Sequence, residues 1–129
     1  MAGKKLSNVD IMSLVSDNEA TPESLLQIRQ TDTYEKWFSG LRDRKAAVRI
    51  AAYFDKAQAL GDLHGDFKAI GGHVIEVRFD VGPGYRVYVT RRGRELVLLL
   101  VGGDKSTQGR DVKKAKELAK EWRREHENQ

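Results

Sequence analysis

Cysteine is absent from this 129-residue chain, which excludes disulfides and thiolate catalysis. Three scattered histidines have no spacing typical of a metal site, and we expect neither a metal nor another cofactor. No apolar run approaches the length of a membrane span, and the first residues lead into a polar segment and not into the apolar core of a signal peptide. These absences favour a soluble cytoplasmic protein that does not engage a membrane.

The chain is long enough for one packed domain and too short for two. Its charge is uneven, because residues 1–24 carry a net −2 while the whole chain carries +4, which leaves +6 on residues 25–129. We therefore divide the chain into an N-terminal extension, 1–24, and a domain, 25–129. A basic domain is compatible with nucleic acid, with an acidic protein partner, or simply with a well-solvated surface.

Helical signals occur in the first half and at the end of the chain. A capping box at Asp32-Thr33-Tyr34-Glu35 predicts a helix from Thr33 to about Arg42, and a second apolar period runs from after Asp43 to Gly61. Together these two helices form an αα-hairpin. A short helix is also expected within residues 1–24, and a last helix is expected to be capped by Ser106 or Thr107.

Strand signals fill the middle of the chain. Residues 25–30 suit either a strand or a helix that starts near Pro22, and we choose the strand. The turns Gly71-Gly72 and Gly82-Pro83-Gly84 separate later strands. Such tight spacing predicts an antiparallel meander, with the apolar run 96–101 as its central strand, covered on both faces. The later strands are expected at 67–70, 74–79, 85–91 and 95–101.

Two cationic residues are expected to meet at one edge of this sheet. Arg86 lies at the start of one strand and Lys105 just after the end of the next, so an antiparallel pair brings them together. Two fixed positive charges suit a phosphate. The amides of the segment 102–107, between a strand and a helix, either join Lys105 in holding a phosphate oxygen or simply cap the helix.

Three further residues near the sheet carry titratable groups. Glu76 and Arg78 alternate in a strand and so share a face, either as a surface pair or as part of a site. His73 is the only histidine expected next to this sheet edge, where it is either suited to proton transfer near neutral pH or simply an exposed residue of a glycine-rich turn.

The lysines of the last helix form a solvated face or add affinity for RNA. Aromatic residues at helical spacing are expected to pack in the core: Tyr34, Trp37, Phe38 and Trp122.

Several short motifs follow one another between Gln27 and about Ala119. With them the chain resembles the phage-derived Gp49/HigB-like addiction-module killer proteins of the RelE/ParE toxin superfamily. The resemblance implies a RelE/ParE-like fold of order β-α-α-β-β-β-β and a cognate antitoxin that binds the toxin as a heterotetramer or larger assembly. The motifs are Thr33-Tyr34-Glu35-Lys36-Trp37-Phe38, Leu41-Arg42-Asp43-Arg44, Gly71-Gly72, Glu76-Val77-Arg78, the run 82–88 and the run 99–108.

The resemblance also implies a metal-independent endoribonuclease. In RNA-cleaving members a cationic pocket binds mRNA in the ribosomal A site and promotes attack of a 2′-hydroxyl on the adjacent phosphate. By motif, Arg78 and Arg86 would hold phosphate oxygens, and Lys105 would stabilise the charge that develops in the transition state.

This chain departs from the ribonucleases of the superfamily at three positions. Val74 and Glu76 stand where the best-known members place lysine bases, and Asp111 stands where a tyrosine is expected. The general base is therefore open among Glu76, His73 and Asp104.

Two other functions fit the same resemblance. One branch of the superfamily poisons DNA gyrase, and a non-enzymatic protein that binds its antitoxin and co-represses the operon is a third class. The cations Arg78, Arg86 and Lys105 favour RNA chemistry, whereas the missing lysines argue against it. The role of residues 1–24 stays open: they are a disordered or separately packed tail, cover the basic site, or dock in a groove of the antitoxin.

Overall fold

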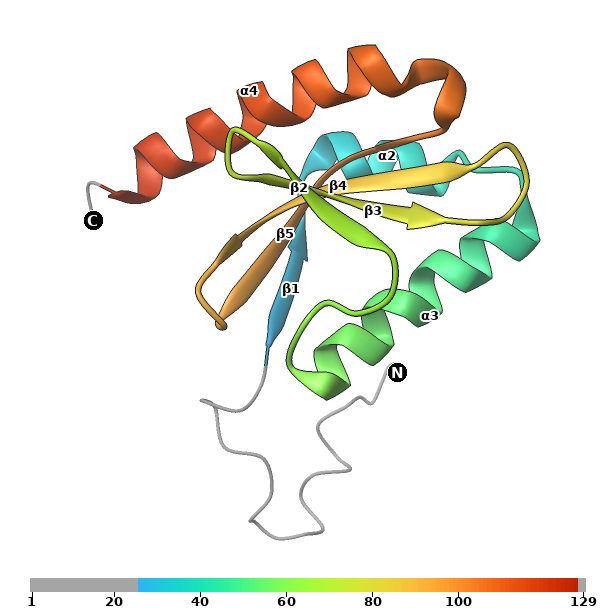
Figure 1. The fold of residues 1–129 in the computed structure, drawn as a ribbon, viewed down its shortest axis with the longest axis horizontal. Helices are drawn as coiled ribbons and strands as arrows, with labels where there is room; N and C mark the ends of the chain where they lie inside the picture. The colour runs from blue at the N-terminus through green and yellow to red at the C-terminus, as the bar shows by residue number, and fades with distance from the viewer. Residues whose placement is uncertain (1–25, 128–129) are drawn as a thin grey trace, which may run out of the picture.

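The computed structural model describes residues 26–127. The short helix expected within residues 1–24 lies outside the described residues. The described part is a five-stranded sheet with helices on both faces, an α+β fold with an N-terminal helix pair and a C-terminal helix, as the resemblance implied. Figure 1 shows α3 and α4 on opposite sides of the sheet. In chain order the elements are β1 (Gln27–Gln30), α2 (Asp32–Ser39), α3 (Arg44–Leu60), β2 (Phe67–Gly71), β3 (Val74–Phe79), β4 (Tyr85–Arg92), β5 (Leu96–Gly103), the 3₁₀ turn η3 (Lys105–Thr107) and α4 (Gln108–Glu127).

The strands lie in the order β1-β5-β4-β3-β2. Strands β2 to β5 form the predicted antiparallel meander, and β1 pairs with β5 in parallel, with Gln27 opposite Leu96. β5 is buried along its whole length, as the apolar run predicted. The middle position nevertheless belongs to β4, because only one strand, β1, lies beyond β5.

The first helix begins and ends earlier than predicted. Its N-cap is Thr31, whose Oγ1 accepts a hydrogen bond from the Tyr34 amide at 3.0 Å, and the helix stops at Ser39. The Thr31 hydroxyl also donates to the Leu100 carbonyl at 2.8 Å, so contact with β5 fixes the start of the helix. The predicted capping box at Asp32 was therefore wrong.

The other helix ends have local causes. Asp43 caps α3 by accepting from the Ala46 amide at 3.1 Å, and Gly61 ends it with a φ of 81°, so the helix begins after Asp43 and ends at Gly61 as expected. The predicted cap at Ser106 or Thr107 was wrong. Asp104 caps the 3₁₀ turn instead, and the turn leads into α4.

Each face of the sheet has its own apolar core. The α2 and α3 face buries Tyr34 and Phe54, with Trp37 and Phe38 packed against them, whereas Trp122 packs on the α4 side. The expected packing roles of these aromatics are confirmed. Among residues 26–127, no helix is both long enough and apolar enough to span a bilayer.

Gly102 is required where α2 crosses β5, because a Cβ there would overlap the indole ring of Trp37. We expect Gly102→Ala to lower the free energy of unfolding by about 3 kcal/mol, the cost of overpacking a rigid core. Gly109→Ala is the control, because its Cβ would meet nothing within 4 Å. This α4 residue should gain about 0.5–1 kcal/mol as alanine. Urea denaturation of both variants measures the difference, and equal stabilities would contradict this packing.

Candidate active site

Four polar side chains share the α4 face of the sheet near one end. Arg78 on β3 and Arg86 on β4 are direct cross-strand partners, and Glu76 is the partner of Tyr88. Side chains two apart on a strand point to the same face, so all four lie together. Gln108, the first residue of α4, reaches down to this group.

Glu76 lies beneath the two arginines. Its side chain is 1% exposed, with Oε1 3.7 Å from Nε of Arg78 and Oε2 3.5 Å from Nε of Arg86. Gln108 donates a hydrogen bond to Oε2 at 2.8 Å. Among the described residues, Oε1 and both Nε atoms are buried without a hydrogen bond, so charge attraction holds the arginines to Glu76. The carboxylate therefore orients both guanidinium groups and offers almost no surface to a ligand.

A pocket of about 310 Å³ opens above these arginines. Arg78, Arg86 and Lys105 all line it, so the structure brings Arg86 and Lys105 together as the strand pairing predicted. Arg86 Nη1 donates to the Gly84 carbonyl at 3.0 Å, which ties the guanidinium to the β3–β4 turn. Three cations from two strands and the η3 turn thus surround one open space. Their catalytic roles remain predictions.

Asp104 precedes the pocket residue Lys105 in the sequence, and its side chain caps the 3₁₀ turn η3. Its Oδ1 accepts from the Ser106 hydroxyl at 2.5 Å and from the Ser106 amide at 2.8 Å. These hydrogen bonds, the hydroxyl first, lower the pKa of Asp104 below its ordinary value. The Ser106 amide is therefore already used, which favours the helix-cap interpretation of residues 102–107 over a cradle for phosphate.

His73 does not join the cationic cluster. It lies in the β2–β3 turn with a φ of 63°, and its carbonyl accepts a hydrogen bond from Thr90 Oγ1 at 2.6 Å. His73 lies five positions before Arg78, a distance of roughly 16 Å along β3. The expectation that His73 lies at the same sheet edge was therefore wrong.

Sequence reasoning missed three residues around the arginines. Asp66 pairs with Arg78 at 3.6 Å from the loop before β2, and its side chain is 66% exposed. Tyr88 is fully buried, and burial together with the Glu76 carboxylate raises its pKa, so the phenol stays neutral. Strand alternation from Arg86 places Tyr88 on this face, and Gln108 ends the run 99–108 that carries the family resemblance, whereas no local signal marks Asp66.

Asp111, which stands where a tyrosine is expected, has a structural role at the start of α4. Thr107 Oγ1 donates to its Oδ2 at 2.5 Å, and the carboxylate covers the backbone of Gly103 on β5. Its side chain is only 8% exposed. Asp111 therefore fixes the start of α4 over the sheet.

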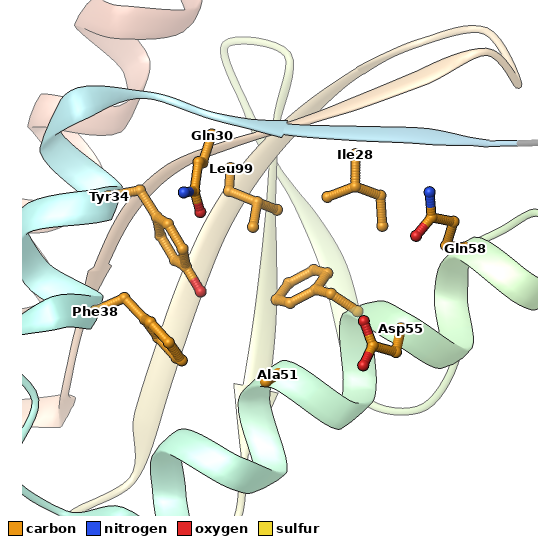
Figure 2. A pocket seen from close by; sticks show the side chains of 9 residues that line it. Ile28, Gln30, Tyr34, Phe38, Ala51, Asp55, Gln58 and Leu99 are labelled. Atoms are coloured by element: carbon orange, nitrogen blue, oxygen red, sulfur yellow. The ribbon is translucent and has the colours of Figure 1, made fainter. Parts of the chain in front are cut away.

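A different kind of pocket opens on the opposite face, between β1, α2 and α3. It encloses about 240 Å³, and apolar side chains such as Ile28, Phe38 and Leu99 form much of its wall. Figure 2 shows Tyr34 directing its hydroxyl into this space, with Asp55 and Gln58 of α3 at the far side. With no cation and one carboxylate in its lining, this pocket is not suited to a phosphate.

A family model and a related protein both match this chain, and the family model identifies the family. Residues 36–124 match the family described as phage-derived protein Gp49-like (DUF891). An uncharacterized protein of Haemophilus influenzae is 44% identical over 96 residues, which cover 74% of this chain and 95% of that protein. The matched region includes every element from α3 to β5 and the cationic pocket. The chain belongs to the Gp49-like family, a family of toxins from toxin–antitoxin systems within the RelE/HigB-like group.

Proposed function

We propose that this toxin is a ribosome-dependent endoribonuclease that cuts mRNA in the cytoplasm and stops translation. One observation carries the proposal: Arg78, Arg86 and Lys105 line a single open pocket above a buried carboxylate. Three convergent cations suit the phosphate at which an RNA strand is cut. Fixed charges of this kind commonly supply the largest part of the rate enhancement in a polar reaction.

The reaction that fits this pocket is transfer of the phosphoryl group from the 5′-oxygen of one nucleotide to the 2′-oxygen of the preceding nucleotide in the RNA strand. The 2′-oxygen forms a bond to the adjacent phosphorus, and the bond from phosphorus to the 5′-oxygen breaks, which leaves a 2′,3′-cyclic phosphate. The proton of the 2′-hydroxyl passes to solvent, and the leaving oxygen takes up another. Arg78 and Arg86 would hold the non-bridging oxygens, and Lys105 would stabilise the charge that grows on them.

The placement of the three candidate bases supports catalysis by charge and positioning. Glu76 is buried under the arginines, His73 lies at the other end of β3, and Asp104 has a lowered pKa and two hydrogen bonds from Ser106. We therefore propose that Glu76 acts as a positioning residue for Arg78 and Arg86. The ribosome would contribute by holding the RNA strand in the bent geometry that attack requires.

The proposed biological setting is neutralisation by a cognate antitoxin. We expect induction of the chain in bacteria that lack the antitoxin to stop growth, with protein synthesis falling before DNA synthesis. Pulse labelling with radioactive methionine and thymidine measures the order. Co-expression of the antitoxin is the control and should restore growth. If DNA synthesis stopped first with broken chromosomes, the target would be gyrase, and unimpaired growth at confirmed expression would contradict toxicity itself.

A further inference from the structure

A second basic surface lies away from the cationic pocket. A groove of about 510 Å³ runs between the β2–β3 turn and residues 116–124 of α4. Because the β2–β3 turn and Arg78 lie at opposite ends of β3, this groove is separate from the candidate active site. Its lining residues are Gly72, His73, Lys116, Lys120, Arg123 and Arg124.

The charges of α4 are sorted by face. At about 100° per residue, the four cations of the groove fall within an arc of roughly 100°. The apolar stripe that packs on the sheet borders one side of this arc, and Glu117, Glu121 and Glu125 project on the other. Although acidic and basic residues alternate along the sequence, the helix gathers the cations beside the turn.

This arrangement places like charges close together on one face of α4. Lys116 and Lys120, and then Lys120 and Arg124, are four residues apart, a spacing at which like charges repel each other on a helix. Among residues 26–127, neither Lys116 nor Lys120 forms an ion pair. An anion bound in the groove would relieve this repulsion.

The backbone holds two of the cations in place. Arg123 Nη2 donates to the Arg91 carbonyl at 3.0 Å, which fixes its guanidinium against β4. The aliphatic stem of Lys116 packs over Gly72, where a Cβ would lie 3.0 Å from its Cγ. Gly72 has a φ of 63°, so glycine suits this turn both sterically and conformationally. The groove therefore presents partly preorganised positive charge.

We propose that this groove binds the sugar–phosphate backbone of RNA, separately from the pocket that cuts it. Phosphate binding requires only positioned cations, whereas a protein partner requires aromatic or aliphatic anchors at the centre of its interface. The lining holds cations, a glycine and a histidine, with no large apolar side chain. The choice of RNA as the nucleic acid rests on the proposed function.

The test measures binding of the full-length chain to a 20-base-pair RNA duplex. Fluorescence anisotropy of the labelled duplex gives the affinity at several salt concentrations. Without ribosomes, binding is measured independently of cleavage, so failure of the ribonuclease proposal would not affect the result. We expect Lys116→Ala/Lys120→Ala to weaken binding about tenfold at 0.1 M salt. The slope of log affinity against log salt should fall by about two, one for each phosphate that a lysine no longer neutralises.

The matched control is Lys56→Ala/Lys114→Ala, which removes the same two charges from exposed helix positions outside the groove. We expect this variant to bind within about twofold of the wild type. Equal losses in the two double variants, or unchanged affinity in both, would overturn the proposal. So would a Lys116→Ala/Lys120→Ala chain that loses antitoxin binding and keeps its affinity for RNA. If the double variant does not fold, the exposed Lys120→Ala alone should halve the change in slope.

Discussion

Lys105→Ala is expected to slow mRNA cleavage by about a hundredfold or more and to abolish toxicity. The substitution removes an exposed ammonium group that lines the pocket and touches neither apolar core. Loss of one charge-stabilising donor commonly costs a few kcal/mol in the transition state. Arg86→Ala should lose at least as much, but it also deprives the buried Glu76 of an ion-pair partner. Lys105→Ala is therefore the cleaner test, with circular dichroism to confirm that both variants fold.

The control for this prediction is Arg94→Ala. Arg94 is exposed in the β4–β5 turn, at the opposite end of β4 from Arg86, and its removal lowers the net charge of the chain by the same amount. We expect full toxicity in this variant. If Lys105→Ala and Arg86→Ala both remained as toxic as Arg94→Ala, the cationic pocket would not be the active site.

Glu76→Gln is expected to impair both stability and activity. The substitution keeps the shape of the side chain but removes the buried negative charge between Arg78 and Arg86. Breaking a buried ion-pair network by removing one partner typically costs about 3–5 kcal/mol. We therefore expect a melting temperature lower by roughly 10–20 °C in a chain of this size. Cleavage measured well below that temperature should still fall tenfold or more, because the arginines lose their orientation.

Glu95→Gln is the matched control for this substitution. Glu95 pairs with Arg92 at 3.7 Å, but its side chain is 76% exposed. Exposed pairs contribute about 0–1 kcal/mol, so stability and cleavage should barely change. A Glu76→Gln variant that cuts RNA at the wild-type rate while folded would show that Glu76 does not position the arginines.

Local sequence patterns predicted much of the fold and part of the site. Strand alternation placed Glu76 and Arg78 on one face, and strand adjacency brought Arg86 to Lys105, because both relations span only a few residues or one hairpin. The same counting places His73 at the far end of β3, since it lies five positions before Arg78. His73 was predicted at the cationic edge because histidine suits proton transfer, and its place along β3 was not taken into account.

Contacts between distant segments were beyond prediction from sequence patterns. The start of α2 depends on a hydrogen bond from Thr31 to the carbonyl of Leu100, which is 69 residues away. Asp66 meets Arg78 through pairing of β2 with β3, and no motif marks it. The groove between the cations of α4 and the β2–β3 turn also joins two distant segments, so the sequence pattern of α4 alone does not predict it.

The most direct measurement adds the purified full-length chain to ribosomes that hold a defined mRNA with one codon in the A site. We predict cleavage within that codon, products with 2′,3′-cyclic phosphate ends, no cutting of the same RNA without ribosomes, and at least a hundredfold slower cutting by Lys105→Ala. Intact mRNA with a wild-type chain that stops bacterial growth, or equal cutting by Lys105→Ala, would contradict the assignment of the cationic pocket as a ribosome-dependent ribonuclease site.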